Sequence, residues 1–154
     1  MHKSFKKHDH RRCIKASVKA LETYCKKSGF QFTKLRKRVL EILLEGHKAI
    51  GAYEVLDKLR FDGVSPQPPM AYRAINFLVT NGFAHKIEKL NAFIACEVPG
   101  IEHKPAFLIC RICRLVSETE NKSTHFQLRK EANNTNFNIE NSVVEAVGVC
   151  PNCE

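Results

Sequence analysis

Apolar residues recur at helical spacing in four segments of the N-terminal half of the chain, and glycine, proline or a capping side chain separates these segments. Such spacing gathers the apolar residues on one face, as in a helix that packs against a core. Thr33 is the expected N-cap of the second helix, and Gly82 is expected to end the fourth. Cys13 and Cys25 are expected to pack as small apolar groups. The four predicted helices are residues 14–28, 34–44, 52–61 and 70–81.

Two short β-like runs, residues 83–87 and 92–96, follow the fourth helix. Helices followed by a two-stranded ribbon are typical of a winged helix-turn-helix, in which the last helix enters the major groove of DNA. On that helix Tyr72, Arg73 and Asn76 fall off the apolar stripe. Tyr72 and Arg73 are therefore predicted to face the groove, where Arg bonds bidentately to guanine. The alternative is that Arg73 is only solvated and that Tyr72 packs partly into the core.

The residues after the ribbon predict a smaller unit that mixes strands with a helix. Its predicted elements are strands at 106–109 and 115–119, a helix at 123–133 and a β-rich run at 137–149. Because about 60 residues bury little surface, this unit is expected to need a metal site and a second copy of itself. The expected fold class is α+β. Its parts are a disordered basic arm at 1–12, a winged helix-turn-helix DNA-binding domain at 13–97 and an α/β dimerisation domain at 98–154.

Positive charge is concentrated in the first part of the chain. The net charge is +9, and residues 1–90 contain 19 Lys and Arg against 8 Asp and Glu, whereas residues 91–154 contain 6 against 8. This asymmetry indicates a polyanionic partner, nucleic acid first of all, and a merely solubilising basic face is the alternative. Within the arm, the alternative to disorder is loose metal binding by His2, His8 and His10.

The composition, 44% hydrophobic and 27% charged, is that of a globular protein. No apolar run approaches the roughly 18 residues that a membrane-spanning helix needs. The basic N-terminus has no apolar stretch behind it, unlike a secretory signal. A cytoplasmic protein with no membrane partner is therefore expected.

Four of the seven cysteines form two C-x2-C pairs, Cys110 with Cys113 and Cys150 with Cys153. Two such turns bring four thiolates around one ion, which predicts a structural zinc site rather than a disulfide framework. A thioredoxin-like redox pair lies at a strand-to-helix junction, whereas Cys150 and Cys153 end the chain. A zinc deaminase needs His-x-Glu, which none of the seven histidines supplies. No enzyme and no small-molecule substrate are therefore expected.

A second set of metal-binding side chains lies on or beside the predicted ribbon, the linker and the first strands of the smaller unit. The set is His85, Cys96, His103 and Glu118. Two imidazoles, one thiolate and one carboxylate all suit zinc, and their shell is formally neutral once the thiol and the carboxyl are deprotonated. The alternatives without a metal are that His85 is a surface residue and that Cys96 is a small buried side chain. Spacing alone does not decide between these alternatives and a metal site.

Two motifs carry a family resemblance. They are Gly29-Phe30-x-x-Thr33-x-x-Arg36-x-x-Val39-Leu40, and Pro68-Pro69-x-x-Tyr72-Arg73-Ala74 with Asn81-Gly82-Phe83. With the paired cysteines, they make the chain resemble the ferric uptake regulators from about residue 29 to 153, and most closely their zinc uptake regulator branch. The iron- and peroxide-sensing branches carry a His-His-Asp-His-type run before the first cysteine pair, where this chain has Glu102-His103-Lys104-Pro105.

The resemblance implies a zinc-dependent transcriptional repressor. Such a protein is a homodimer that binds operator DNA of zinc-uptake genes and holds two zinc ions per subunit. The paired cysteines match the family's structural site, and the second set falls where the zinc branch carries its regulatory ligands. The implied DNA contacts are Tyr72, Arg73, Asn76, Thr33 and Arg36.

One departure from the family is Met70-Ala71, where Ser/Thr-Val is usual. The lost hydroxyl removes an N-cap or a phosphate contact, which affects fine DNA specificity. The alternatives are a regulator of the same family that responds to iron, manganese or nickel, a zinc-ribbon interaction module without a groove-reading helix, and a metalloenzyme with an open coordination position.

Overall fold

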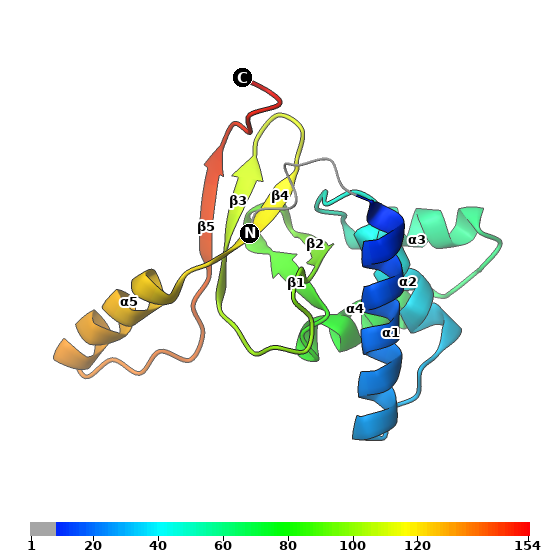
Figure 1. The fold of residues 1–154 in the computed structure, drawn as a ribbon, viewed down its shortest axis with the longest axis horizontal. Coiled ribbons are helices and arrows are strands. Elements are labelled where there is room, and N and C mark those ends of the chain that lie inside the picture. Colours follow the sequence, from blue (N-terminus) through cyan, green and yellow to red (C-terminus); the bar gives the residue numbers. More distant parts are fainter. Residues whose placement is uncertain (1–8) are drawn as a thin grey trace.

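The computed structural model describes residues 9–154, with four helices on one side, a three-stranded sheet on the other and a small hairpin between them (Figure 1). None of the helices in this part of the chain is long and apolar enough to cross a membrane. In chain order the elements are α1 (His10–Ser28), α2 (Lys34–Leu44), α3 (Ala52–Phe61), α4 (Pro68–Thr80), β1 (Ala84–Ile87), the 3₁₀ turn η1 (Glu88–Leu90), β2 (Ala92–Ala95), β3 (Pro105–Cys110), β4 (Val116–Glu120), α5 (Lys122–Asn134) and β5 (Val144–Gly148).

The helical unit, α1–α4, buries one apolar stripe of each helix in a common core. Thr33 caps α2 as predicted, because its side chain accepts a hydrogen bond from the backbone of Arg36. The α4 helix begins two residues earlier than predicted, since a proline fits the first helical turn, where its missing N–H is not needed. Cys25 is buried in this core as predicted, while Cys13 is half-buried.

The prediction of disorder for residues 1–12 is wrong for its last residues. Asp9 caps α1 by accepting a hydrogen bond from the Arg11 backbone at 3.0 Å, so the helix begins at His10. An N-cap carboxylate accepts a hydrogen bond from an N–H group that the first turn leaves unpaired. The helix therefore begins before the first of its regularly spaced apolar residues. The rest of the predicted arm, including His2 and His8, lies outside the described residues.

The wing (residues 84–95) is the antiparallel hairpin of β1 and β2, with Ala84 opposite Ala95. The second sheet has the strand order β4-β3-β5, antiparallel between β3 and β4 and parallel between β3 and β5. The predicted β-rich run at 137–149 is a strand only over Val144–Gly148. Its earlier residues form a loop that leaves Phe137 65% exposed, because β3 offers no partner to them.

Wing and second sheet share a junction cluster of buried apolar side chains. Its members are Ala49, Ile87, Ala92, Ile94, Phe107, Ile109 and Val116. The loop after α2 also joins the units, because Ile50 exchanges backbone hydrogen bonds with Phe93 of the wing at 2.9 and 2.8 Å, and Val116 of β4 donates to the His47 carbonyl at 3.0 Å. The angle between the helical unit and the second sheet is thus set by packing and hydrogen bonds through the wing.

Candidate metal centres and nucleic-acid interface

The four paired cysteines meet at one end of the second sheet. Cys110 ends β3 and Cys113 lies in the turn after it, while Cys150 and Cys153 follow β5. Because β3 and β5 are parallel, with Cys110 opposite Gly148, the two C-x2-C turns leave the sheet side by side. All four Sγ atoms lie within 4.8 Å of one another, and Cys113 Sγ is 3.7 Å from Cys150 Sγ. A tetrahedral ZnS₄ site has sulfurs roughly 3.8 Å apart, so the donors fit zinc.

The electrostatics of these thiols also suit a cation. The backbone N–H of Cys113 is the main reason that the pKa of Cys110 falls to about 6, and the Cys150 N–H adds a hydrogen bond to the same sulfur at 3.4 Å. The opposite holds for Cys153, whose pKa rises to about 12, chiefly because of the hydrogen bond with Cys150. Cys110 is thus mostly ionised at neutral pH, whereas Cys153 keeps its proton until a positive ion compensates the charge of the sulfurs.

The second set forms a quartet at the junction between the units. His85 lies on β1, Cys96 comes directly after β2, His103 is in the segment before β3, and Glu118 lies on β4. One ligand atom from each residue lies within 4.8 Å of all the others. The quartet therefore draws its donors from the wing, from the segment that follows it and from the second sheet.

Two distances inside the quartet match a tetrahedral zinc shell, while His103 Nε2 and Glu118 Oε1 are in direct contact. His85 Nε2 is 3.4 Å from Glu118 Oε1, and Cys96 Sγ is 3.6 Å from His103 Nε2. Ordinary zinc bond lengths place an N and an O ligand roughly 3.4 Å apart and an S and an N ligand roughly 3.6 Å apart. His85 Nε2 is buried and makes no well-aligned hydrogen bond among the described residues, although the Glu118 carboxylate faces it, as expected of two donors placed around an ion.

Neighbouring backbone groups orient two of the four ligands. His103 Nδ1 contacts the Ile101 carbonyl at 2.6 Å. If Nδ1 carries the proton and donates there, Nε2 remains free for a metal. The backbone N–H of Glu97 donates to Glu118 Oε2 at 2.9 Å, which leaves Oε1 to face the histidines. Such outer contacts fix the orientation of metal ligands.

Burial and charge shift the pKa values of the two acidic ligands in opposite directions. Burial acts to raise the pKa of Glu118, but the imidazole of His85, the Glu97 N–H and His103 outweigh it and lower the pKa to about 2. Burial, followed by the charge of Glu118, raises the pKa of Cys96 to about 12. The carboxylate is therefore ready to bind a cation, whereas the thiol gives up its proton only when a cation replaces it.

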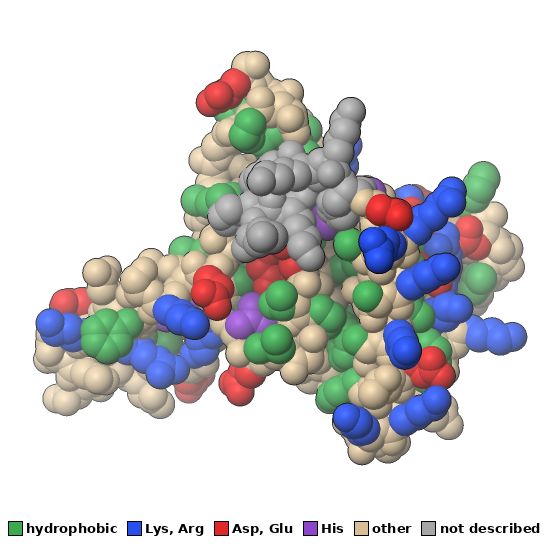
Figure 2. Space-filling view, viewed as in Figure 1, with side chains coloured by type: hydrophobic (Ala, Val, Ile, Leu, Met, Phe, Trp, Pro, Cys, Tyr) green, Lys and Arg blue, Asp and Glu red, His purple; other side chains and the backbone are tan. Residues whose placement is uncertain are grey.

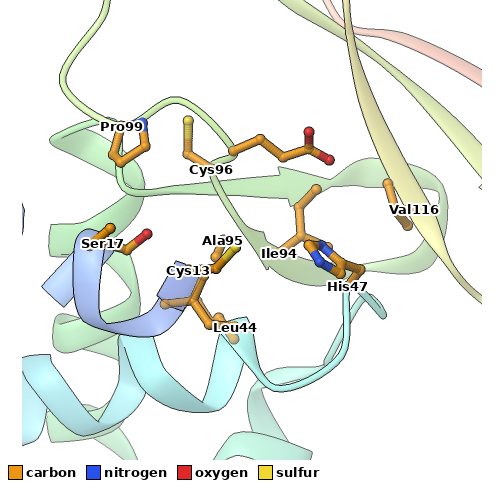
Figure 3. A pocket seen from close by; sticks show the side chains of 12 residues that line it. Cys13, Ser17, Leu44, His47, Ile94, Ala95, Cys96, Pro99 and Val116 are labelled. Atoms are coloured by element: carbon orange, nitrogen blue, oxygen red, sulfur yellow. The ribbon is translucent and has the colours of Figure 1, made fainter. Parts of the chain in front are cut away.

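A mostly apolar cavity of about 200 Å³ lies beside the quartet, between α1, α2 and the wing (Figure 3). Cys13 and Cys96 both line it, from α1 and from the end of β2. The ligand atoms that cluster with Cys96 do not include the thiol of Cys13. Cys13 therefore packs against an apolar space, in keeping with its prediction as a small apolar group.

The predicted groove-reading residues lie on the outer face of α4. Tyr72, Arg73 and Asn76 are exposed, whereas the apolar stripe of the helix is buried. Tyr72 is 38% exposed, which also fits the alternative that it packs partly into the core, so that alternative stays open. In the view of Figure 2, Lys and Arg side chains gather over α1–α3, with a smaller group on α5. The DNA contacts themselves stay a prediction.

Thr33 and Arg36 have structural partners within the helical unit. Thr33 serves as the cap of α2, and the Arg36 guanidinium lies 3.6 Å from the centre of the Phe77 ring while donating to the Gln31 carbonyl at 2.6 Å. Cation–π stacking holds the guanidinium against α4. A DNA contact by either residue also stays a prediction.

The sequence predicted none of the contacts that join wing and second sheet apart from the quartet. Glu145 of β5 accepts hydrogen bonds from the backbone of Glu88 and Lys89, and Phe107 of β3 lies 5.4 Å from the His85 ring, centre to centre. The continuous apolar run in β3 is the one signal that pointed to burial of Phe107. A carboxylate that bonds to backbone N–H groups has no signature in the sequence.

A winged helical unit joined to a small sheet through a mixed His, Cys and Glu site defines the class of two-domain, metal-dependent DNA-binding regulators. No protein-family model matches the chain. The chain is 32% identical over 133 residues to the zinc uptake regulation protein of Escherichia coli (strain K12), covering 86% of this chain and 78% of that protein, and it matches the Shigella flexneri protein equally. It belongs to the ferric uptake regulator family, in the zinc uptake regulator branch, which confirms the resemblance found in the sequence.

Solved structures extend this comparison to the arrangement of the units. A zinc uptake regulator complexed with zinc and DNA has a TM-score of 0.86 at 30% identity, covering 91% of this chain and 94% of that chain. Holo XcZur gives 0.81 at 37% identity, covering 90% and 96%, whereas apo XcZur gives 0.54 at 36%, covering 92% and 98%. Identity and coverage are nearly equal for these two forms, so this chain is more similar in overall structure to the holo form than to the apo form.

Proposed function

We propose that the protein is a cytoplasmic, zinc-responsive transcriptional repressor, rather than an enzyme, which binds operator DNA of zinc-uptake genes as a homodimer. The observation that carries this proposal is the quartet, because its donors come from both sides of the junction. The relatives named for zinc uptake regulation, and the relative bound to zinc and DNA, support the same function.

The quartet acts by favouring one arrangement of the two units. His85 lies on the wing and Cys96 directly after it, whereas Glu118 lies on the second sheet. Zinc, when bound, supplies a divalent charge that all four donors share. With the quartet complete, α4 is held at a fixed angle to the second sheet, and thus to the α4 of a partner subunit. A ligand that binds one arrangement better must favour that arrangement, and DNA and zinc then strengthen each other's binding.

The four-cysteine site has a structural role in this proposal. It ties the end of β3 to the segment after β5, and so closes the second sheet at one end. An all-sulfur shell has no open position and stays occupied, contributing to folding rather than to sensing. Each subunit therefore holds two zinc ions, one structural and one regulatory.

Dimerisation is assigned to the C-terminal domain, residues 98–154. Its strand β5 is an edge of the second sheet. Exposed apolar side chains are numerous there, with Phe126 71% and Val147 51% exposed. An unpaired edge and exposed apolar side chains of this kind favour pairing with another chain, and a two-fold dimer suits palindromic DNA.

DNA reading is assigned to α4 of the N-terminal domain, with Tyr72, Arg73 and Asn76 facing the major groove. Phosphate contacts are assigned to the basic residues of the first 90 positions, together with Thr33 and Arg36. The Met70-Ala71 pair supplies no hydroxyl at the start of this helix, so sequence preference rests on the remaining side chains.

The test of this function is a DNA-binding titration under buffered metal. A duplex selected by the zinc-loaded protein from a random-sequence pool serves as probe, and affinity is measured against free zinc, iron(II), manganese and nickel. Zinc should tighten binding at the lowest free concentration, because the quartet includes a thiolate and has tetrahedral spacing. A stronger response to another ion would reassign the metal, and no response to any ion would refute the proposed function.

A further inference from the structure

Three residues form one row across the second sheet and face the wing. In register, Phe107 of β3 lies opposite Glu118 of β4 on one side and opposite Glu145 of β5 on the other. Residues directly opposite one another point to the same face of a sheet. Glu118 belongs to the quartet and Phe107 to the junction cluster. Glu145 therefore lies on the face that meets the wing, but outside both of these groups.

The carboxylate of Glu145 binds the wing directly. Its Oε1 accepts a hydrogen bond from the Glu88 backbone N–H at 2.6 Å, and its Oε2 accepts one from the Lys89 N–H at 2.9 Å. These two groups open η1, and N–H groups at the start of a helical turn have no partner within that turn. An ionised acceptor makes each of these hydrogen bonds stronger than a neutral one would.

Glu145 and the quartet hold opposite ends of the same hairpin. His85 and Cys96 lie near the base of the wing, whereas Glu88 and Lys89 are in the turn at its tip. The junction cluster, with Ile87 and Phe107, fills the space between these two attachments. The wing cannot tilt away from the second sheet without breaking the contact at its tip, whether or not the quartet holds an ion.

We propose that Glu145 is a positioning residue. Its contact with the wing acts as a latch: it favours, without any metal, the closed arrangement, in which the wing is packed against the second sheet. It thereby sets how much free zinc the protein needs for half-maximal DNA binding. This inference rests on the proposed function. The quartet is complete only when wing and sheet are packed together, so every contact that raises the fraction of protein in that arrangement tightens apparent zinc binding in proportion to that fraction. Loss of the latch leaves the DNA-reading residues and all eight metal ligands in place.

The experiment compares Glu145→Ala and Glu145→Gln with Glu131→Gln, which removes the charge of an exposed carboxylate on α5. Each protein carries a full four-cysteine site, which is checked by zinc content and by dimer mass. The free zinc at half-maximal binding to the selected duplex should rise about tenfold for Glu145→Ala, equivalent to about 1.4 kcal/mol. Glu145→Gln keeps one acceptor oxygen and should show a smaller rise. A midpoint within twofold of the Glu131→Gln value for both variants would overturn the latch.

A second measurement separates failure of the latch from failure of the proposed function. Amide hydrogen exchange at Glu88 and Lys89 is followed in protein whose quartet is empty. The latch predicts protection of these two amides in the wild type and at least tenfold faster exchange in Glu145→Ala, with the amides of β1 and β2 unchanged. Equal exchange in the two proteins overturns the latch. A wild type whose DNA affinity ignores zinc overturns the proposed function, whatever the exchange shows.

Discussion

Replacing Cys96 with alanine removes one ligand of the quartet and changes little else. The side chain is 2% exposed and lies next to an apolar cavity, so alanine is well tolerated there. The packing loss should cost about 1 kcal/mol of folding free energy. Because Cys96 is one of the two ligands on or next to the wing, its loss should abolish the zinc-dependent gain in DNA affinity, which a coupling of about 2.7 kcal/mol makes about 100-fold.

The chain offers a matched control for this substitution. Cys25 is 1% exposed in the core of the helical unit, away from both sets of ligands. Cys25→Ala should therefore carry a similar folding cost and keep the full zinc response. The assay measures affinity for the selected duplex at low and saturating free zinc, with thermal unfolding of each variant alongside. A gain of 50-fold or more in Cys96→Ala, on a folded dimer, would refute the assignment of the quartet as the switch.

Other substitutions test the remaining parts of the account. Cys110→Ser should abolish stable folding, because it opens the sulfur site that ties β3 to the end of the chain; a cooperatively unfolding dimer by calorimetry would contradict this role. Arg73→Ala should cost about 1–3 kcal/mol on the selected duplex, measured against a scrambled duplex, and equal losses on both would reduce Arg73 to a phosphate contact. Deleting residues 1–8 should flatten the salt dependence of DNA binding, and an unchanged slope would show that this segment makes no phosphate contacts.

Local chemistry explains which elements were predictable. The α2 and α3 helices have the predicted bounds because a threonine cap and a glycine mark their starts. The starts of α1 and α4 were placed too late, since Asp9 caps a turn that has no apolar stripe, and since prolines that break a helix interior are accepted at its first turn. The run at 137–149 was extended too far because β-branched residues predict strand even where no neighbouring strand is available.

The two sets of metal ligands differed in how far spacing could identify them. A C-x2-C pair fixes two sulfurs in one turn, so the four-cysteine site could be predicted from local geometry. The quartet depends on how the wing folds against the second sheet, which brings His85 to Glu118, so the residue types made it a candidate, spacing left it open, and the family resemblance favoured it. Glu145 escaped prediction altogether, because its partners are backbone N–H groups.

The most direct test of the central claim compares wild-type protein loaded with one zinc ion per chain and with two, using the same selected duplex. Mild chelation leaves the sulfur site filled and empties the quartet, and metal analysis verifies both states. If the quartet is the switch, the second ion should tighten DNA binding about 100-fold. Equal affinity in the two states would contradict this claim, because occupancy of the quartet would then not control the arrangement of α4.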